Sequence, residues 1–298
     1  MRKNILVIGG TRFFGVRLVR RLIAAGHRIT IATRGLTPDD FGDRVRRVQV
    51  DRKDLVAMTA AFGALGGFDV VFDQMCYTPR DAAIASAVFG GRVQRYVMAS
   101  TLEVYRACYG AIARPFVEAD VQGGEDALDL DEPDYAAGKR HAEAVLARDT
   151  RLPAVRVRIG HVLAGPEDFT GRLASYVTRV RQGAPLRHAE GAAATSFIGA
   201  DEIAAFLCWV GDADFTGAVN AASQAWSAVE LHRRVAGVLG LAARTEPVAG
   251  VVEPTVLSPF DYAAPYVMST ARAQNLGHAF ARDAGWLDDA IRSHAGTA

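Results

Sequence analysis

The stretch Ile5–Gly15, which reads ILVIGGTRFFG, decides the fold of this chain. Its first four residues are all apolar, as expected for a strand that is buried on both faces. The two glycines that follow allow a tight backbone turn, and Phe14–Ala25 then shows apolar residues at helical spacing. A strand, a glycine turn and a helix in this order predict a helix N-terminus that can bind a pyrophosphate.

Outward from this stretch, short apolar runs alternate with longer helical patterns. The segments expected as strands are Asn4–Ile8, Arg28–Ala32, Arg47–Val50, Phe68–Asp73, Arg95–Ala99 and Ala154–Ile159. Besides Phe14–Ala25, Pro79–Phe89 and Tyr135–Leu146 have helical patterns. This alternation predicts βαβ units, and therefore an α/β fold with a doubly wound parallel sheet, the Rossmann fold.

The pattern becomes less regular after about Gly165, where glycine and proline interrupt the apolar segments often. We expect residues 1–165 to form a dinucleotide-binding domain. Residues 166–298 are expected to form mainly a smaller substrate-binding region. The two should be interlocked, because no linker separates them.

Composition narrows the class of protein. The chain has 298 residues, of which 50% are hydrophobic, and its 34 Lys+Arg and 33 Asp+Glu leave a net charge of +1. This excludes a disordered chain and gives no field that would attract nucleic acid or an anionic membrane. Three cysteines in no metal or redox spacing predict reduced thiols, no metal site and a cytoplasmic protein. The apolar run Ile5–Ile8 is too short for a membrane span.

The residues after the second strand bear on which dinucleotide is bound. Sheets that bind NAD usually end this strand with an acid, whereas NADP-binding ones place an arginine nearby. Here no acid is present and Arg34 follows the strand, so we expect NADP, with NAD as the alternative. Solvated surface arginines are the competing interpretation of Arg34 and Arg12. The residues expected to hold the cofactor at the glycine turn are Gly9, Thr11, Arg12, Phe13, Phe14 and Gly15.

Further cofactor contacts are expected after the third and fourth strands, since open α/β sheets bind ligands at the carboxyl ends of their strands. Asp51 and Arg52 follow the third strand, where the Asp51 carboxylate can accept from an adenine amino group. Met75 lies in the segment that follows the fourth strand, where the nicotinamide ribose would pass. A plain N-cap or turn role is the alternative for Asp51 and Asp73.

Tyr135 and Lys139 are four residues apart in a predicted helix and should share one face. A nearby ammonium favours the phenolate, so the tyrosine can work as an acid or base closer to neutral pH. Because this spacing also occurs by chance, a surface pair is the alternative. Thr101 follows the fifth strand, and Glu103 would reach the same pocket if the segment stays extended.

These segments, in this order, resemble the short-chain dehydrogenase/reductase superfamily, in particular its extended branch of NAD(P)-dependent epimerase/dehydratase proteins. The turn resembles an atypical subgroup in which Arg12 replaces the second glycine of the usual pattern. The resemblance implies that Tyr135 is the catalytic acid/base, with a hydride passing to or from the nicotinamide. It also implies that Lys139 anchors the ribose and lowers the pKa of the tyrosine, and that Thr101 supplies the hydroxyl of the catalytic triad. Ser100 is the fallback if the register slips by one.

Glu103 gains a second interpretation from this resemblance. The segment Thr101–Tyr105, TLEVY, is similar to the Thr-Asp-Glu-Val-Tyr segment of sugar-nucleotide 4,6-dehydratases. In those enzymes the glutamate is a base and the aspartate protonates the leaving hydroxyl. Leu102 stands in place of that aspartate, so Glu103 is expected either to be a base that supports epimerisation or dehydration, or to bind a substrate hydroxyl.

Two hypotheses of function follow. The first is an NAD(P)-dependent oxidoreductase, epimerase or dehydratase acting on a sugar, a sugar nucleotide or a polyhydroxylated biosynthetic intermediate. The second is a non-catalytic NADP-binding or RNA-associated protein, supported only by a basic cluster of Arg44, Arg46, Arg47, Arg52 and Lys53. For the first, the expected partners are a small-molecule substrate and a second copy of the chain, with no nucleic acid and no membrane.

Overall fold

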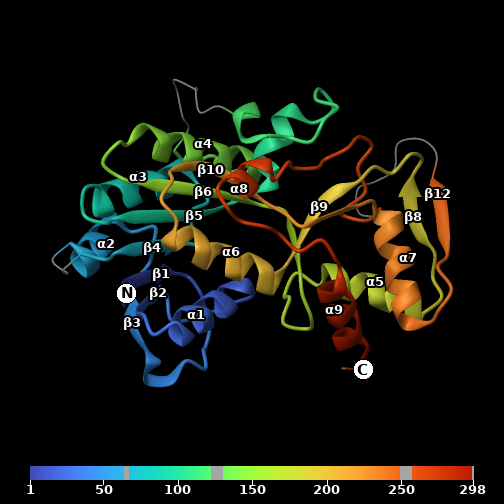
Figure 1. Ribbon diagram of the computed structural model, residues 1–298, viewed down its shortest axis with the longest axis horizontal. Helices are drawn as coiled ribbons and strands as arrows, with labels where there is room; N and C mark the ends of the chain where they lie inside the picture. The colour runs from blue at the N-terminus through green and yellow to red at the C-terminus, as the bar shows by residue number, and fades with distance from the viewer. Residues whose placement is uncertain (64–66, 122–129, 249–256, 297–298) are drawn as a thin grey trace. The chain divides into compact units, whose positions relative to one another are not determined.

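The structure is a computed structural model that describes residues 1–63, 67–121, 130–248 and 257–296 (Figure 1). The chain divides into two compact units. The first comprises Met1–Ala107, Glu118–Ile159 and Ile203–Asn220, and the second comprises Cys108–Val117, Gly160–Glu202 and Ala221–Ala298. The chain thus passes between the units several times. Residues 203–220, which the sequence pattern grouped with the C-terminal region, pack with the first unit.

The first unit is built on a seven-stranded sheet in the order β10-β6-β5-β4-β1-β2-β3. Each pairing from β3 to β6 is parallel, and Ile5 on β1 lies opposite Ile29 on one side and Val70 on the other. The order runs outward from β1 in both directions, which confirms the predicted doubly wound sheet. The strands are β1 Asn4–Ile8, β2 Arg28–Thr33, β3 Val45–Gln49, β4 Val70–Asp73, β5 Arg95–Thr101, β6 Ala154–Ile159 and β10 Gly217–Ala221.

Helices cover both faces of this sheet, and Figure 1 shows α3 and α4 on one face with α1 and α6 on the other. In the part of this unit that the structure describes, the helices are α1 Phe14–Ala24, α2 Leu55–Phe62, α3 Pro79–Phe89, α4 Tyr135–Arg148 and α6 Ala200–Asp212. Leu6 and Ile8 belong to one core cluster with Phe62, Ile84 and Leu146. The odd-numbered side of β1 therefore faces α1 and α6. The helix α2 was not expected from the sequence.

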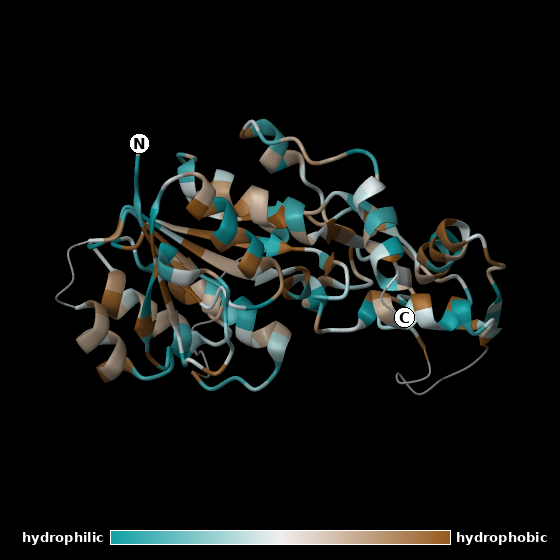
Figure 2. Ribbon diagram, turned by 90° about the horizontal axis from the view of Figure 1, so that it is seen from below, coloured by the Kyte–Doolittle hydropathy of each residue, from teal (hydrophilic) through white to brown (hydrophobic). Residues whose placement is uncertain are grey.

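Burial explains why the strands are apolar on both faces. Leu6 and Val7 are neighbours on β1 that point to opposite faces, and both are fully buried. Figure 2 shows the strands of the sheet as predominantly hydrophobic. Their carboxyl ends, where β1, β4 and β5 finish side by side, carry the polar residues that the sequence singled out.

The second unit has its own core, in which α5, α7 and α9 pack around Leu173, Phe197, Leu231 and Leu287. It contains a three-stranded sheet in the order β11-β9-β7 and a two-stranded sheet of β12 and β8. Its strands are β7 His161–Leu163, β8 Leu186–Ala189, β9 Thr195–Gly199, β11 Gln224–Trp226 and β12 Thr245–Val248. Its helices are α5 Arg172–Arg181, α7 Ala228–Leu239, α8 Ala271–Asn275 and α9 Gly285–Gly296.

Candidate active site

The glycine turn forms as the sequence predicts. After β1, Gly9 and Gly10 have φ angles of 92° and 90°, a region that favours glycine. Phe13, with φ of 51°, is the N-cap of α1 and has no side-chain oxygen to satisfy the helix N–H groups, and no acid lies in the first turn. The N-terminus of α1 therefore keeps a partial positive charge that suits an anion.

The turn is packed tightly against the segment after β4. A Cβ atom on Gly15 would lie 2.3 Å from Gln74 Oε1 and 2.9 Å from the Cα of Gly10, so only glycine fits there. The Nε2 of Gln74 is buried and has no hydrogen-bond partner among the described residues. A buried donor beside an uncapped helix N-terminus fits an anionic group such as a pyrophosphate.

At the end of β2, Arg34 is exposed and its carbonyl oxygen accepts from Gln49 Nε2 at 3.1 Å. Gly35 follows with a φ of 75° and packs on the Gln49 side chain. Within the described part of the chain no ion pair holds the Arg34 guanidinium. Arg12 is exposed as well, so both arginines lie at the surface of the turn region.

The side chain of Arg52 does not lie where a cofactor contact was expected. Asp51 is exposed, and its Oδ1 accepts from the Lys53 amide at 2.9 Å. Arg52 instead is buried, with its Nη2 2.7 Å from Asp73 Oδ2 and its Nη1 3.6 Å from Asp81 Oδ1. The Arg52 guanidinium is thus engaged inside the protein, and Asp51 is the residue of this pair whose carboxylate is exposed to a ligand.

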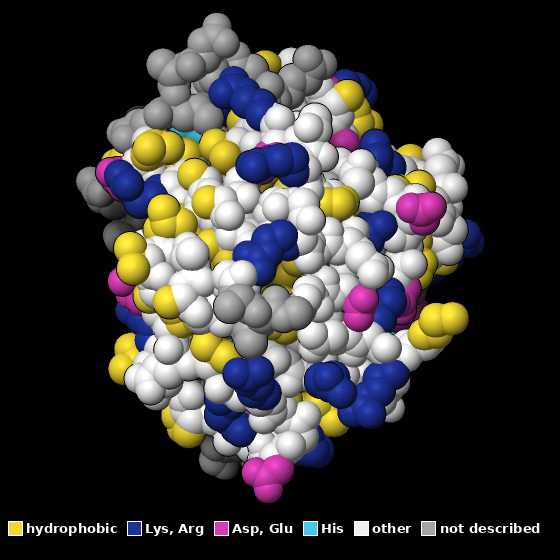
Figure 3. Space-filling view, turned by 90° about the vertical axis from the view of Figure 1, so that its left-hand side faces the viewer, with side chains coloured by type: hydrophobic (Ala, Val, Ile, Leu, Met, Phe, Trp, Pro, Cys, Tyr) yellow, Lys and Arg dark blue, Asp and Glu magenta, His cyan; other side chains and the backbone are white. Residues whose placement is uncertain are grey.

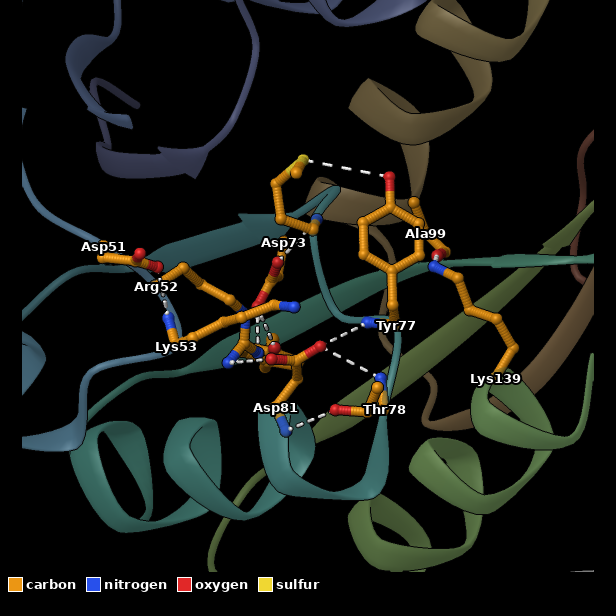
Figure 4. A network of polar contacts seen from close by, with 11 residues as sticks. Asp51, Arg52, Lys53, Asp73, Tyr77, Thr78, Asp81, Ala99 and Lys139 are labelled. Carbon is orange, nitrogen blue, oxygen red and sulfur yellow. Dashed lines mark hydrogen bonds and ion pairs between the residues drawn. The ribbon is translucent and has the colours of Figure 1, made fainter. Parts of the chain in front are cut away.

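Two buried carboxylates organise the segment between β4 and α3, as Figure 4 shows. Asp73 accepts from the Met75 amide at 2.8 Å and from the Tyr96 hydroxyl at 2.6 Å. Asp81 accepts from the amides of Tyr77 and Thr78 at 2.8 and 3.0 Å, which completes a capping box at the start of α3. Burial and the Asp73 carboxylate raise the pKa of Tyr96 well above its ordinary value.

From the sequence, Asp73 begins the segment expected to pass the nicotinamide ribose, with a turn or N-cap role as the alternative, and Asp81 is not singled out. The capping-box pattern Thr78-Pro79-Arg80-Asp81 is a signal that would have identified Asp81. Nothing local indicates that Arg52 joins the two carboxylates, because the three residues come from separate elements.

Tyr135 and Lys139 lie at the start of α4, where Asp134 caps the helix by accepting from Ala137 N at 2.8 Å. Tyr135 is 49% exposed, whereas Lys139 is only 2% exposed. The Lys139 Nζ donates to Ala99 O at 2.7 Å and lies 4.3 Å from the centre of the Tyr77 ring. Burial lowers the pKa of Lys139 to about 8, so the ammonium is less costly to deprotonate than in water.

Thr101 is the last residue of β5, is partly exposed, and its hydroxyl accepts from the Glu103 amide at 3.2 Å. The expectation of an extended segment here is wrong, because Leu102–Cys108 form a 3₁₀ helix. Glu103 therefore does not follow strand alternation. It lines a surface hollow of about 270 Å³ together with Arg106, Asp134 and Arg140.

Ser100 does not serve as the fallback hydroxyl. Its Oγ is buried and donates to Glu143 Oε1 at 2.5 Å. Glu143 in turn forms a buried ion pair with Arg158, with Nη2 2.7 Å from Oε2 and Nε 3.1 Å from both oxygens. Arg158 also donates to the Tyr105 hydroxyl at 2.9 Å. This network fixes α4 against β5 and β6.

In the second unit, His161 packs between the rings of Phe197 and Phe260. Its Nε2 lies 3.2 Å from the Tyr262 hydroxyl, and burial lowers the pKa of His161 to about 3. The imidazole is therefore neutral near pH 7. The Arg172 guanidinium is also engaged, since its Nη2 donates to Val162 O at 3.0 Å.

The basic cluster that supported an RNA-associated protein is broken up in the structure. Arg52 is buried in its ion pair, and Arg47 pairs with Asp39 at 2.5 Å. Figure 3 shows lysine and arginine side chains scattered over one face, with hydrophobic side chains between them. In the described ranges, no three His, Cys, Asp or Glu side chains gather closely enough to hold a metal ion. No helix of the described part is both long and apolar enough to cross a membrane.

Two curated proteins are similar to this chain. A 2'-dehydrokanamycin reductase of Streptomyces kanamyceticus is 32% identical over 213 residues, which cover 68% of this chain and 56% of that protein. A chloroplast stem-loop binding protein of 41 kDa, form b, of Arabidopsis thaliana is 32% identical over 118 residues, which cover 35% of this chain and 30% of that protein. The chain thus spans about half, or less, of the length of these relatives.

The fold is shared with a dTDP-glucose 4,6-dehydratase of Bacillus anthracis solved in complex with NAD. That structure gives a TM-score of 0.75 at 15% identity and is matched over 99% of this chain and 97% of the other. The family model described as "NAD dependent epimerase/dehydratase family" matches residues 5–222. Because this match runs over most of the chain, the protein belongs to the NAD dependent epimerase/dehydratase family.

Proposed function

We propose that the protein is a nicotinamide-dependent oxidoreductase that interconverts a hydroxyl and a carbonyl group on a sugar or another polyhydroxylated compound. One observation carries this proposal: Tyr135 is half exposed while Lys139, four residues later on the same helix, is buried. A phenol in this position is accessible to a substrate, and an ammonium held behind it favours the phenolate form.

In the reducing direction, the Tyr135 hydroxyl gives its proton to the substrate oxygen, and the Lys139 ammonium stabilises the phenolate that remains. The Thr101 hydroxyl, at the end of the neighbouring strand β5, donates to the same substrate oxygen. In the oxidising direction, the Tyr135 phenolate takes the hydroxyl proton. A nicotinamide ring, when bound, supplies or accepts the hydride.

The residues present fit a dinucleotide. The glycine turn at Gly9 and Gly15 and the buried donor of Gln74 suit the pyrophosphate, as the structure of this turn supports. Thr11, Arg12, Phe13 and Phe14 complete the turn, and Met75 would adjoin the nicotinamide ribose. The Asp51 carboxylate would accept a hydrogen bond from the adenine amino group. The exposed Arg34 would pair with a 2′-phosphate, so NADP is the expected form and NAD the alternative.

Oxidation or reduction without elimination fits this site better than dehydration. Loss of a hydroxyl needs an acid to protonate the leaving group. The position where the resemblance would place that acid is Leu102, which is 1% exposed. The alternative function is an epimerase or dehydratase in which Glu103 acts as the base. The chain is similar to a protein named 2'-dehydrokanamycin reductase, and this similarity favours the reducing direction.

The test is the Tyr135→Phe variant, assayed by NADPH absorbance with a panel of keto sugars and nucleotide sugars. We expect turnover to fall about 100- to 10,000-fold, because a general acid or base is lost. Binding of NADPH, measured by fluorescence titration, should change little. Undiminished turnover in this variant would remove Tyr135 from the mechanism and overturn the proposal.

The remaining expectations stay predictions. A homodimer would form through α3 and α4, and sedimentation would detect it. A cytoplasmic location would be checked by fractionation. Absence of RNA binding would be checked by titration at low salt, where phosphate contacts are strongest.

A further inference from the structure

The ring of Tyr77 lies against both residues of the proposed acid/base pair. Its centre is 4.3 Å from Lys139 Nζ and 6.2 Å from the centre of the Tyr135 ring. Lys139 and Tyr135 belong to α4, whereas Tyr77 comes from the segment between β4 and α3. We propose that Tyr77 is a positioning residue for the reaction, whose ring keeps the Lys139 ammonium charged and in place beside Tyr135. This inference rests on the proposed function.

The need for such a ring follows from the burial of Lys139. An ammonium has three N–H donors, and the carbonyl oxygen of Ala99 accepts one of them. The charge is nearly sealed from water, so its desolvation must be offset by neighbours. The face of an aromatic ring attracts a cation most strongly where water is excluded. The ring of Tyr77 supplies this attraction on a second side of the ammonium.

The other charged and titratable groups near Lys139 are Asp73 at the end of β4, Cys76 after β4, Asp81 on α3 and Arg52 after β3. Burial has the largest effect on the pKa of Lys139; Cys76 and the two carboxylates oppose it, and Arg52 adds to it. Arg52 is also the ion-pair partner of both carboxylates, which reduces what they offer to the lysine. The aromatic face of Tyr77 is therefore an important support of the charged lysine.

The backbone around Tyr77 is held from one side by the two buried carboxylates. Asp73 accepts from the Met75 amide, and Asp81 accepts from the amides of Tyr77 and Thr78 (Figure 4). Arg52 lies between the carboxylates and prevents their mutual repulsion. The position of the ring is thus set by the chain on both sides of Tyr77.

On the other side, Gly138 allows the loop to approach α4. A Cβ atom at this position would lie 2.9 Å from the backbone oxygen of Tyr77 and 3.4 Å from that of Glu132. The first distance is too short for a real contact, so any larger residue would displace the loop or the helix. The glycine directly before Lys139 is therefore required for the contact between Tyr77 and Lys139.

The ring of Tyr77 acts, and its hydroxyl does not. Burial raises the pKa of Tyr77 to about 12, and Tyr135, Asp73 and Asp81 act in the same direction, so the phenol stays protonated near pH 7. Among the described residues, the hydroxyl contacts only a weak acceptor, Met75 Sδ, at 3.9 Å. This separates two substitutions: Tyr77→Phe keeps the ring, and Tyr77→Leu removes it.

The experiment measures kcat, KM and the pH profile of NADPH-dependent turnover for these two variants and the unaltered protein. Tyr77→Phe should stay within about 3-fold in kcat, whereas Tyr77→Leu should lose about 10-fold with little change in KM. Because Lys139 must be charged, activity declines above its pKa. Without the ring this decline should move down by about one pH unit. An unchanged profile in Tyr77→Leu, or an equal loss in Tyr77→Phe, would overturn the inference.

Two further variants make the result unambiguous. Gly138→Ala should reproduce the kcat loss and the profile shift of Tyr77→Leu even if the latter folds poorly, and normal kinetics in Gly138→Ala would count against the inference. Tyr135→Phe belongs in the same assay. Full turnover there would overturn the proposed function and this inference with it. Loss there, together with unaltered kinetics in Tyr77→Leu, would overturn the role of Tyr77 alone.

Discussion

The two ends of the candidate cofactor site are built differently. At the end formed by β4, β5 and α4, two charged residues are buried: Lys139 is 2% exposed and Asp73 is fully buried. At the end formed by β1, α1 and β2, Arg12, Arg34 and Asp51 are exposed, and the helix N-terminus is left uncapped.

This difference separates two tasks. The reacting end must hold a phenol and an ammonium within narrow limits, and buried groups that are held by hydrogen bonds and ion pairs are rigid. The nucleotide end needs only donors and charges that a ligand completes on arrival. We therefore expect substitutions at the reacting end to affect stability and turnover, and substitutions at the nucleotide end to affect binding.

The largest expected effect is on the stability of the reacting end. Arg158→Met leaves the buried Glu143 carboxylate without its ion-pair partner, and we expect a loss of about 3–5 kcal/mol in the free energy of unfolding. Urea denaturation measures it. The double variant Arg158→Met/Glu143→Leu should recover much of the loss, because no buried charge remains unpaired. A loss under about 1 kcal/mol in the single variant would contradict the expectation that substitutions at the reacting end reduce stability.

The second effect concerns pH and Lys139. Its pKa is lowered from the ordinary 10.5 to about 8 by burial, so the unfolded chain binds more protons than the folded chain between these values. Stability should therefore rise with pH over this window, by at most about 1.4 kcal/mol per unit, whereas below it the full cost of the buried charge is present. Lys139→Met should lack this rise. Urea denaturation of both proteins at several pH values measures how the free energy of unfolding changes with pH. The same change with pH in both proteins would contradict the prediction.

The third effect concerns cofactor affinity at the nucleotide end. Gly15→Ala would place a methyl group against Gln74 and Gly10, and we expect cofactor affinity to fall about 10-fold, in line with overpacking costs of about 1–3 kcal/mol. Gly237→Ala is the control, because no described atom outside the neighbouring backbone of its own helix lies within 4 Å of the added Cβ. That control should keep the affinity and gain about 0.5–1 kcal/mol of stability, since it lies inside α7. Equal affinities in both variants would show that the turn tolerates a side chain.

The smallest effect is specific to one form of the cofactor. Arg34→Ala should weaken NADP binding about 10-fold, leave NAD binding unchanged and leave stability within about 0.5 kcal/mol. Arg46→Ala, an exposed arginine on β3, is the matched control. Isothermal titration with both dinucleotides gives the four constants. Equal losses for NADP and NAD would refute the assignment of Arg34 to a 2′-phosphate.

The success of prediction differed between local features and long-range contacts for a physical reason. The glycine turn and the helix that carries Tyr135 and Lys139 are local features, and their hydrogen bonds run between residues a few positions apart. Arg52 was expected at the ligand because it follows a strand, yet it pairs with Asp73, 21 residues away. Glu103 was expected on an extended segment, and the 3₁₀ helix after β5 showed that alternation does not apply.

The sequence by itself determined the doubly wound sheet, the glycine turn and the placement of Tyr135 and Lys139 on one helix, since these follow from periodicity and local backbone preferences. Only the tertiary structure decided that Lys139 is buried over the Tyr77 ring, that Arg52 lies between two carboxylates and that Ser100 faces Glu143. Burial and charge pairing depend on which segments, distant in the sequence, come into contact across the sheet. No local sequence pattern predicts those contacts.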